Sequence, residues 1–596
     1  MLLAGIINKQ VSDLCLQQQQ HHHQLHGHNK FLTQNRSTPN KQQQQLMICC
    51  CSSRTVMMRA HACNTKSKNK EWVLAIDVGT GGTKAALITS KGCVSTSAFS
   101  AHPPPSPSCL AGTASAEQEM ERWWDATVEV VRTCMAMAAA SHSGTVRALT
   151  VTGQMQNVIL LPQNKLELAP PAILYSDARA VVEATEIARL AGGADYLASV
   201  SGSHQGATSV LAKLRWLDKH DSNAAQHCQT LLLGGHDYVV WKLCGVCVTD
   251  STTASTTGLT DLSFKYATGL MHDVGLGHWI DKLPLIHPPN IPCGEVSAWA
   301  AEELGNVSLQ GIPVVHCCGD AGACTLGAGA GVLGNLYAYL GTSGWVAGSF
   351  QHSAGRPPKA KPMPIPSGVF TLGHPESSLV FKTGSIMTAG GNLAWAASTG
   401  YPGSVSMKQI DSLVKLERAG CGGLLYLPYL NGERCPFEDG NARACFIGIS
   451  ASTTREQMLR AVMEGVAFAL RSSYDALAGG ELHDSDTRCT PLRLVGGGAR
   501  SPVWPSIMAG VFGQTVEVLM DPQEVGVKGA ALLAGQWLGW HSTLSPGGNW
   551  VQQEQTYDPS PNDVKIYDEM YPIYTKVYDG LRDTFHDLSA FQRPSL

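Results

Sequence analysis

Apolar runs that recur from about residue 70 onward predict a chain of alternating strands and helices. Val73 to Ile76 and Thr83 to Ile88 are apolar runs of strand length joined by glycines. Ser115, with Gln118 three residues later, has the pattern of a helix-capping box. The apolar positions that follow at helical spacing predict a buried helix face made of Trp124, Val128, Val131 and Met135.

The rest of the first half continues in the same style. A proline-rich loop is expected at residues 103–107. The stretch "GIPVVHCCGDAGACTLGAGAG", residues 311–331, predicts a strand, a tight turn and a helix, with Asp320 at the turn. Further strands are predicted at 146–153, 157–161 and 172–177, and further helices at 181–191 and 209–219.

The second half repeats this pattern. "LYAYLGTSGWVAGSF", residues 336–350, predicts two strands around a Gly-Thr-Ser-Gly turn. A long helix is predicted at 455–477, a strand with three glycines and a helix start at 492–504, and a small-residue helix at 526–539. A short tail rich in Pro and Tyr closes the chain. The pattern therefore predicts two α/β domains, each led by a strand–turn–strand unit, with a boundary near residue 332.

The first 70 residues differ in composition from everything that follows. They contain the polar tracts "LQQQQHHHQLHGH" and "KQQQQL", and they carry nine Lys or Arg with a single acid, Asp13. We expect a disordered extension over 1–70, either an organelle transit peptide or a segment without a targeting role. The expected location is intracellular: chloroplast or mitochondrion with a transit peptide, cytoplasm without one. Two domains, 71–332 and 333–541, and a C-terminal tail, 542–596, complete the plan.

The composition indicates a globular protein and excludes some partners. With 44% hydrophobic and 15% charged residues, the 596-residue chain can bury large cores. Its net charge of −4 gives no case for a nucleic-acid partner. Residues 321–355 carry no charged side chain and are long enough to cross a bilayer, but many glycines interrupt them. We therefore expect a helix and a hairpin around a buried site there, and no membrane partner.

Cysteine usage indicates reduced intracellular thiols. The 19 cysteines are scattered and do not form the framework of a short disulfide-rich chain. Cys244 and Cys247 have the spacing of a redox or metal pair, but a zinc site would need a second pair with matching spacing. A turn between two strands is the favoured interpretation, and a redox role for the pair stays open.

The glycine-rich stretch "VLAIDVGTGGTKAALIT", residues 73–89, fits neither common nucleotide fingerprint. Lys84 is followed by alanine, so the G-x-x-x-x-G-K-[ST] loop is absent, and a strand follows where a dinucleotide motif needs a helix. The stretch is therefore predicted to be a hairpin turn, either a plain one or one whose backbone N–H groups bind an anion. A second turn, "YLGTSGW" in the other domain, favours a polyphosphate held between the two.

Short motifs in a fixed order resemble one protein family. They are "AIDVGTGGTKAAL", "GQM", "YSDARA", "KLRWLDKH", "HDYVVWKL", "GDAGACTLGAG", "YLGTSG", "YLPYLNGERCPF" and "VGGGARSPVWPSIMAGVFGQ". Over residues 72–540 the set resembles the FGGY family of carbohydrate kinases, most of all its xylulokinase branch. The resemblance implies an α/β, two-lobed actin/hexokinase-like (ribonuclease H-like) ATPase fold with a central cleft. It also implies phosphorylation of a sugar or polyol hydroxyl with Mg-ATP.

The resemblance assigns roles to the turns. Asp77, before the glycines, would hold Mg²⁺ through water, because a carboxylate repels phosphate but binds the cation that bridges phosphates. Asp320 would be the general base that accepts the sugar hydroxyl's proton, and an N-capping role is compatible with that. ATP would be bound from both domains by Gly79, Thr80, Gly81, Gly82, Lys84, Gly341, Thr342, Ser343, Gly496, Gly497, Gly498, Arg500 and Ser501.

The sugar would be bound by Met155, Gln156, Asp177, Arg179 and Asp320, with Asp177 and Arg179 either lining the pocket or bracing it. In the xylulokinase pattern a His follows the Met and an Asn follows the catalytic Asp, whereas this chain has Gln156 and Ala321. An unpaired group in a buried sugar site costs about 1–3 kcal/mol, enough to change the preferred sugar. The expected substrate is a ketopentose, with D-xylulose giving the 5-phosphate as the default. Ribulose, a deoxy-ketose, glycerol or another polyol are the alternatives.

Two other classes compete with a sugar kinase: a nucleotide-switched chaperone or filament protein of the same superfamily, and a kinase-like binding protein without catalysis. The segments "KLRWLDKH" and "YLPYLNGERCPF" argue against the first. The presence of both Asp77 and Asp320 argues against the second. The expected partner is a small-molecule sugar, and a homodimer is compatible with the resemblance.

Overall fold

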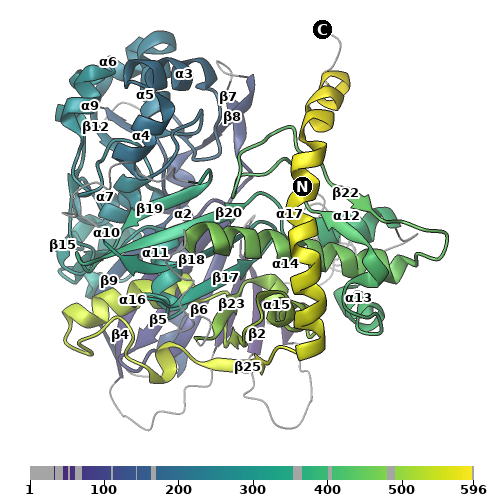
Figure 1. Cartoon of the computed structure of the whole chain (residues 1–596). Coiled ribbons are helices and arrows are strands. Elements are labelled where there is room, and N and C mark those ends of the chain that lie inside the picture. Colours follow the sequence, from purple (N-terminus) through teal and green to yellow (C-terminus); the bar gives the residue numbers. More distant parts are fainter. Residues whose placement is uncertain are drawn as a thin grey trace, which may run out of the picture.

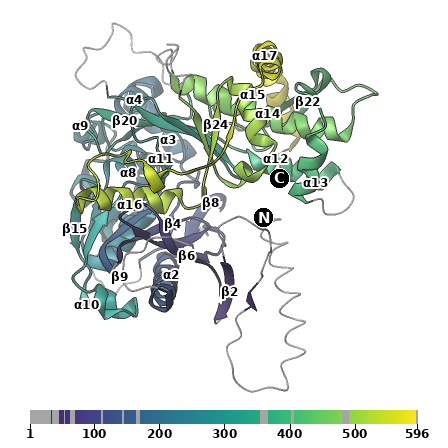
Figure 2. The same ribbon diagram turned by 90° about the horizontal axis from the view of Figure 1, so that it is seen from below.

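The computed structural model describes residues 70–108, 112–141, 144–162, 169–352, 366–400, 406–478 and 490–592, together with three short strands at 32–33, 45–51 and 54–60. Two large sheets, each covered by helices, form two lobes (Figures 1 and 2). The first lobe holds the purple and blue elements of Figure 1, and the second holds most of the green and yellow ones.

The sheet of the N-terminal lobe has nine strands. In spatial order they are β1 (Leu32–Thr33), β2 (Gln45–Cys51), β3 (Arg54–Ala60), β6 (Val94–Ala101), β5 (Gly82–Thr89), β4 (Lys70–Gly79), β9 (Gly144–Gly153), β16 (Pro313–His316) and β15 (Pro292–Glu295). β4 and β5 form the predicted antiparallel hairpin, whereas β4 with β9 and β9 with β16 are parallel pairs. The expectation of disorder over residues 1–70 is wrong at β2 and β3, which extend this sheet. The polar tracts and any transit peptide lie outside the described residues, except where the second tract runs into β2.

Helices cover both faces of this sheet, which explains why β4 is apolar almost throughout. Leu74 and Ile76 pack in the core that includes α2 (Met120–Ser141). Val73 and Ala75 point to the other face, where α16 (Val525–Trp537) packs against them. A strand buried on both sides reads as a continuous hydrophobic run, as residues 73–76 do.

The predicted capping box is wrong. Ser115 and Gln118 lie in β8 (Gly112–Gln118), and α2 begins only at Met120. β8 forms a small sheet with β7 (Ser106–Ser108) and β11 (Ala172–Ile173), so the predicted loop ends before Pro107. The Gln118 side chain contacts the glycine-rich turn instead: its amide nitrogen donates to the carbonyl oxygens of Thr80, at 3.0 Å, and Pro103, at 3.1 Å. Gln118 thus holds the glycine-rich turn.

The rest of the N-terminal lobe forms a second layer rich in helices. The two helices predicted at 181–191 and 209–219 are present as α3 (Val181–Leu190) and α5 (Val210–His220). The hydroxyl of Ser209 caps α5 by accepting from the Ala212 N–H at 3.2 Å. The other elements are β10 (Ile159–Pro162), α4 (Ala194–Ser201), α6 (Ser222–His227), β12 (Cys228–Leu232), α7 (Gly235–Cys244), β13 (Val248–Thr249), α8 (Ser251–Ser255), α9 (Thr268–Asp273), η2 (Gly277–Lys282), β14 (Leu285–Ile286), α10 (Ala298–Glu303), η3 (Val307–Leu309) and α11 (Asp320–Gly327).

Cys244 is the last residue of α7, and Cys247 precedes β13. The expected turn between two strands is therefore wrong: a helix ends there, with Gly245 in the left-handed conformation as its cap. The described cysteines are free thiols.

The sheet of the C-terminal lobe has seven strands. In spatial order they are β19 (Val369–Gly373), β20 (Leu379–Ile386), β18 (Gly344–Gln351), β17 (Leu336–Leu340), β23 (Leu492–Val495), β24 (Val516–Leu519) and β25 (Gln553–Tyr557). β17 and β18 are the predicted hairpin, and β17 runs parallel to β23. The uncharged stretch from residue 321 thus folds, over its described part, as a helix and a hairpin. Among the described residues no helix is both long and apolar enough to cross a membrane.

Helices and short elements complete this lobe. They are α12 (Gly390–Gly400), α13 (Met407–Val414), η4 (Cys421–Gly423), β21 (Leu425–Leu427), β22 (Cys445–Ile447), α14 (Arg455–Ala478), η6 (Gly497–Arg500), α15 (Trp504–Phe512), η7 (Gly548–Trp550) and α17 (Pro561–Gln592). The long helix predicted at 455–477 is α14.

The expectation of a short C-terminal tail is wrong. Residues 553–557 add β25 to the edge of the sheet, and α17 is a helix of 32 residues that runs past α14 and α15 (Figure 1). Four of its aromatic side chains recur at helical spacing and are buried in the core of the lobe: Tyr567, Tyr574, Tyr578 and Phe585.

Two crossing helices, α11 and α16, join the lobes. A Cβ atom at Gly327 would lie 1.8 Å from the carbonyl oxygen of Val525, and one at Gly529 would lie 1.8 Å from that of Ala323. Only glycine permits this approach of two backbones. Figure 2 shows α16, which is late in the sequence, lying against β4 of the first lobe. The crossing fixes α11, whose first residue is Asp320, relative to both sheets.

Candidate active site

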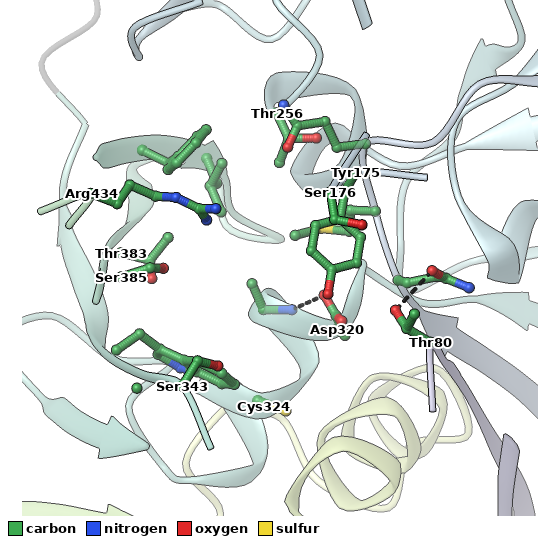
Figure 3. A pocket seen from close by; sticks show the side chains of 18 of the residues that line it. Thr80, Tyr175, Ser176, Thr256, Asp320, Cys324, Ser343, Thr383, Ser385 and Arg434 are labelled. Atoms are coloured by element: carbon green, nitrogen blue, oxygen red, sulfur yellow. Dashed lines mark hydrogen bonds between the residues drawn. The ribbon is translucent and has the colours of Figure 1, made fainter. Parts of the chain in front are cut away.

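A cavity of about 420 Å³ lies between the lobes. Figure 3 shows Asp320, Thr80, Tyr175 and Ser176 on one wall, with Arg434, Thr383 and Ser385 on the opposite one. The N-terminal lobe lines it with Thr80, Gln154, Met155, Gln156, Tyr175, Ser176, Thr256, Asp320, Ala321 and Cys324, and the C-terminal lobe with Ser343, Gly344, Trp345, Phe370, Leu372, Thr383, Ser385, Ile386, Met387 and Arg434.

Parallel pairing in the first sheet brings three predicted segments to this cavity. The strands β4, β9 and β16 run in the same direction, so their carboxyl ends meet at one edge. β4 ends in the turn 79–82, β9 in residues 154–156, and β16 in the turn that leads to Asp320. The Thr80 hydroxyl donates to the Gln154 side-chain oxygen at 3.0 Å, which ties the first two segments together.

The glycine-rich turn is shaped by close contacts on one side and open space on the other. Gly79 and Gly82 close the hairpin as directly opposed residues. A Cβ at Gly82 would lie 2.4 Å from the ring of Phe99, so only glycine fits there. A Cβ at Gly81 would meet no atom within 4 Å. The turn therefore leaves its outer backbone accessible to a ligand.

The second lobe repeats this arrangement. Because β17 and β23 are parallel neighbours, the turn 341–343 and the glycines 496–498 emerge at the same edge. Gly496 has φ +95°, and its Cβ would lie 2.6 Å from the carbonyl oxygen of Leu340. Gly497 has open space around its Cβ position. The two glycine segments predicted to bind ATP thus lie side by side, and Ser343 reaches the cavity wall.

Asp77 is half-buried at the end of β4, directly opposite Lys84 in the hairpin. Burial raises the pKa of the Asp77 carboxyl, while the charges of Lys84 and His236 act to lower it. A Cβ at Gly526, in the first turn of α16, would lie 2.8 Å from Oδ2 of Asp77. Glycine thus keeps one side of the carboxylate open. The negative charge of Asp77 is only partly balanced by its neighbours, and there is space beside the carboxylate. A hydrated divalent cation fits such a site, so these residues are compatible with Mg²⁺.

Asp320 lies at the cavity as the first residue of α11, and Gly319 holds the N-cap position. Its Oδ1 accepts a hydrogen bond from the Ala321 N–H at 2.8 Å. Burial first, and then the negative charge of Asp77, raise the pKa of Asp320 to about 7. A carboxyl group with that pKa in a ligand cavity has the character of a general base.

The predicted sugar residues separate into two groups. Met155 and Gln156 lie in the cavity wall, and Gln156 has φ 61°, an uncommon conformation for a residue with a side chain. Asp177 and Arg179 are absent from that wall. The Asp177 carboxylate accepts from the Ala116 N–H at 2.6 Å and pairs with the Arg179 guanidinium at 2.7 Å. Arg179 also pairs with Glu117 at 2.6 Å. Asp177 and Arg179 therefore brace β8, the strand that ends in Gln118.

Besides Thr80, three of the predicted ATP residues have side chains that bind other protein groups. Lys84 donates to the carbonyl oxygen of Gln523 and lies 3.7 Å from the buried Glu524, so it links β5 to the residues just before α16. The Arg500 guanidinium donates to the side chain of Gln523 at 2.5 Å. The Ser501 hydroxyl donates to Asp411 at 2.6 Å and accepts from the first N–H groups of α15. These contacts give Ser501 a capping role.

Sequence reasoning missed several wall residues. Arg434 is the most distinctive: its guanidinium forms no hydrogen bond or ion pair with another described residue, although it lines the cavity. Its neighbour Glu433 is buried, and burial raises the pKa of that carboxyl to about 7. The motif "NGERCPF" contains Arg434, but the sequence does not indicate that this side chain points into the cavity. Tyr175, Thr383 and Ser385 stand in ordinary strand and loop patterns without any local signal.

Comparison with known proteins identifies the family. The N-terminal domain model of the FGGY family of carbohydrate kinases matches residues 72–327, and the C-terminal domain model matches residues 336–537. The chain is 25% identical over 528 residues to the xylulose kinase of Bacillus subtilis, covering 88% of this chain and all of that protein.

Two solved structures are similar over nearly their whole length. The crystal structure of xylulose kinase from Rhodospirillum rubrum has a TM-score of 0.73 at 27% identity, covering 86% of this chain and 100% of that one. The gluconate kinase from Lactobacillus acidophilus has a TM-score of 0.77 at 23% identity, covering 87% and 100%, and shows likeness of fold alone. The predicted two-lobed α/β fold is thereby confirmed. The chain belongs to the FGGY family of carbohydrate kinases and is a phosphotransferase that acts on an alcohol group.

Proposed function

We propose that this kinase transfers the γ-phosphoryl group of Mg-ATP to the 5-hydroxyl of a ketopentose, with D-xylulose as the acceptor. The observation that carries the proposal is Asp320, a carboxyl group with a raised pKa in a cavity that polar side chains of both lobes line. Relatives named xylulose kinase support the choice of sugar. A cavity of about 420 Å³ is within the size range of small-molecule sites.

In this proposal the residues of the two lobes have separate roles. Asp320 accepts the proton of the attacking hydroxyl. The turns 79–82 and 341–343 orient phosphate oxygens with their N–H groups, and Gly496 to Gly498 contact the nucleoside. Asp77 would hold the magnesium ion that accompanies ATP. Bound Mg-ATP supplies the phosphoryl group together with the charge that neutralises it.

Apolar wall residues of the second lobe would exclude water from the reacting groups. Trp345, Phe370 and Leu372 line the cavity from β18 and β19. Water competes with the sugar hydroxyl for the phosphoryl group, so its exclusion favours transfer over hydrolysis. Closure of the lobes on the sugar is the expected way to complete this exclusion.

One observation favours a second acceptor class, a sugar acid such as gluconate. The unpaired guanidinium of Arg434 would match a carboxylate at the end of the acceptor away from Asp320. Gln156 and Ala321 also stand where the xylulokinase pattern has His and Asn. A neutral ketose can use the same guanidinium through its carbonyl and hydroxyl oxygens, so substrate competition decides between the two.

The test is ADP release with D-xylulose, D-ribulose, glycerol and D-gluconate, each at several concentrations, followed by mass spectrometry of the product. We expect the highest kcat/KM with D-xylulose and a single phosphate on the terminal carbon. A higher kcat/KM with gluconate would replace the ketopentose by a sugar acid. ADP release that no acceptor stimulates would favour a nucleotide-switched protein.

A further inference from the structure

Four fully buried polar side chains lie next to the turn that carries Asp320 and outside the cavity wall. They are His236 and Asp237 in the first turn of α7, Asp250 at the N-cap of α8, and His316 at the end of β16. His236 Nε2 lies 3.1 Å from Asp250 Oδ2 and 3.4 Å from Asp237 Oδ1. His316 Nε2 lies 2.8 Å from Asp237 Oδ1. These contacts connect three elements of the N-terminal lobe.

The network reaches the backbone immediately before Asp320. Oδ1 of Asp250 accepts from the Gly319 N–H at 3.4 Å and from the Thr253 N–H at 3.0 Å. A Cβ at Gly319 would lie 2.2 Å from Sδ of Met155 and 2.7 Å from the Thr253 hydroxyl. Gly319 is therefore confined between Met155, in the cavity wall, and the α8 cap. Asp250 thus contacts the residue that immediately precedes Asp320.

His236 supplies the charge that this arrangement needs. Two carboxylates buried this deeply are stable only if they are hydrogen-bonded and partly neutralised. Burial acts to lower the pKa of His236, but the charge of Asp237 and the hydrogen bond to Asp250 outweigh it and raise the pKa. The Asp250 carboxyl has its pKa lowered to about 2, against the effect of burial, by the hydrogen bond from His236. The raised pKa of His236 and the lowered pKa of Asp250 both favour an ion pair between these two side chains.

We propose that His236 is a positioning residue for phosphoryl transfer: with Asp250 it holds the Gly319–Asp320 turn, and it places a buried positive charge behind the catalytic carboxylate. The inference rests on the proposed role of Asp320 as general base. The charge of His236 opposes burial and Asp77, which raise the pKa of Asp320. The titratable groups that interact electrostatically with Asp320 come from several elements, namely Asp77 of β4, His236 of α7, Asp250 of the α8 cap, Cys324 of α11, and Tyr337 and Tyr339 of β17.

A bound metal ion is the competing explanation, because one ligand atom from each of the four residues lies within 4.8 Å of the others. Two observations favour the network. A histidine that binds a metal usually donates its second ring nitrogen to an acceptor, whereas Nδ1 of both His236 and His316 lacks a partner among the described residues. Oδ2 of Asp237 also accepts from the N–H groups of Leu233, at 2.9 Å, and Gly234, at 3.0 Å.

The experiment measures the pH profile of kcat/KM for D-xylulose in the full chain and in His236→Gln, which keeps an amide donor but removes the charge. We expect the acid limb to move to higher pH by about one unit, so that activity falls about fivefold at pH 7, about tenfold below pH 6, and recovers in alkali. The KM values for D-xylulose and for ATP should stay within a few-fold of those of the unchanged protein. The matched control is His278→Gln, a surface histidine that also lies 3.0 Å from an aspartate, Asp218. Its profile should equal that of the unchanged protein.

Each other outcome has a defined meaning. A profile for His236→Gln that is unchanged, or lower at every pH by the same factor, overturns the proposal. About one equivalent of tightly bound zinc or other metal, lost in His236→Gln, overturns it in favour of a metal site. If His236→Gln does not fold, Thr253→Val is the second variant: it removes the hydroxyl that donates to Asp250 Oδ2 at 2.6 Å and keeps the shape of the side chain. An unchanged kcat in that variant also overturns the proposal. If no acceptor stimulates ADP release in the unchanged protein, the proposed function is wrong, and the role of His236 is then not the cause of the failure.

Discussion

Replacement of Gly529 by alanine tests whether the crossing of α11 and α16 positions the active site. An exposed glycine inside a helix normally gains about 1 kcal/mol on replacement by alanine. At Gly529 the added Cβ would lie 1.8 Å from the Ala323 carbonyl oxygen and 2.9 Å from the Gly327 nitrogen, where ordinary contact begins at 3.4 Å. The two backbones must therefore separate by about 1.5 Å. Overpacking of this kind costs about 3 kcal/mol at the upper end of its usual range.

The expected net loss for Gly529→Ala is about 2 kcal/mol in the free energy of unfolding. The kcat of Gly529→Ala should also fall, by about a hundredfold, because α11 carries Asp320 and a displacement of about 1 Å can cost that much in rate. The matched control is Gly580→Ala in α17, where a Cβ would meet no atom within 4 Å. That variant should gain about 1 kcal/mol and keep its kcat. Urea unfolding and ADP release measure both quantities. A Gly529→Ala protein as stable and active as Gly580→Ala would refute the reasoning.

Three further predictions concern single side chains. Burial and Asp77 raise the pKa of Asp320 to about 7, so kcat/KM should fall about tenfold per pH unit below that pKa. A bound cation would move this pKa to a lower value. A flat profile from pH 5.5 to 8 would contradict the assignment. Arg434→Gln should raise KM for the sugar about tenfold with little change in KM for ATP, and Arg434→Lys should restore part of the loss; unchanged steady-state constants would remove Arg434 from the sugar site. Asp177→Ala should cost about 3–5 kcal/mol in urea unfolding, because it leaves buried Arg179 without this partner, while KM for the sugar stays the same; a large rise in KM at full stability would return Asp177 to the sugar site.

Local patterns predicted what depends on local chemistry. The two glycine hairpins, the strand–turn–helix at Asp320 and the long helix α14 follow from apolar period and glycine position. The convergence of Asp320, Met155 and Gln156 on one cavity is consistent with their following parallel strands. The roles assigned to them remain proposals.

Contacts distant in sequence account for what the patterns missed. Ser115 and Gln118 match a capping box, but pairing of β8 with β7 and β11 keeps that segment extended. α17 escaped recognition because Pro572, a residue that normally interrupts a helix, lies inside it. Ser501 stands beside the glycines in sequence, yet its hydroxyl bonds to Asp411, which is 90 residues away. Arg434 gives no local sign that it reaches a cavity.

The central claim is that Asp320 is the base for transfer to a sugar hydroxyl. It is tested most directly by the D-xylulose-dependent rate of ADP release in Asp320→Asn, with the binding constant of the sugar measured on the same protein. The asparagine keeps the shape and the contact at the start of α11 but cannot accept the proton. The account predicts a fall of about 10²- to 10⁴-fold in kcat, with sugar affinity changed only a few-fold. A variant that retains near-full turnover would contradict it.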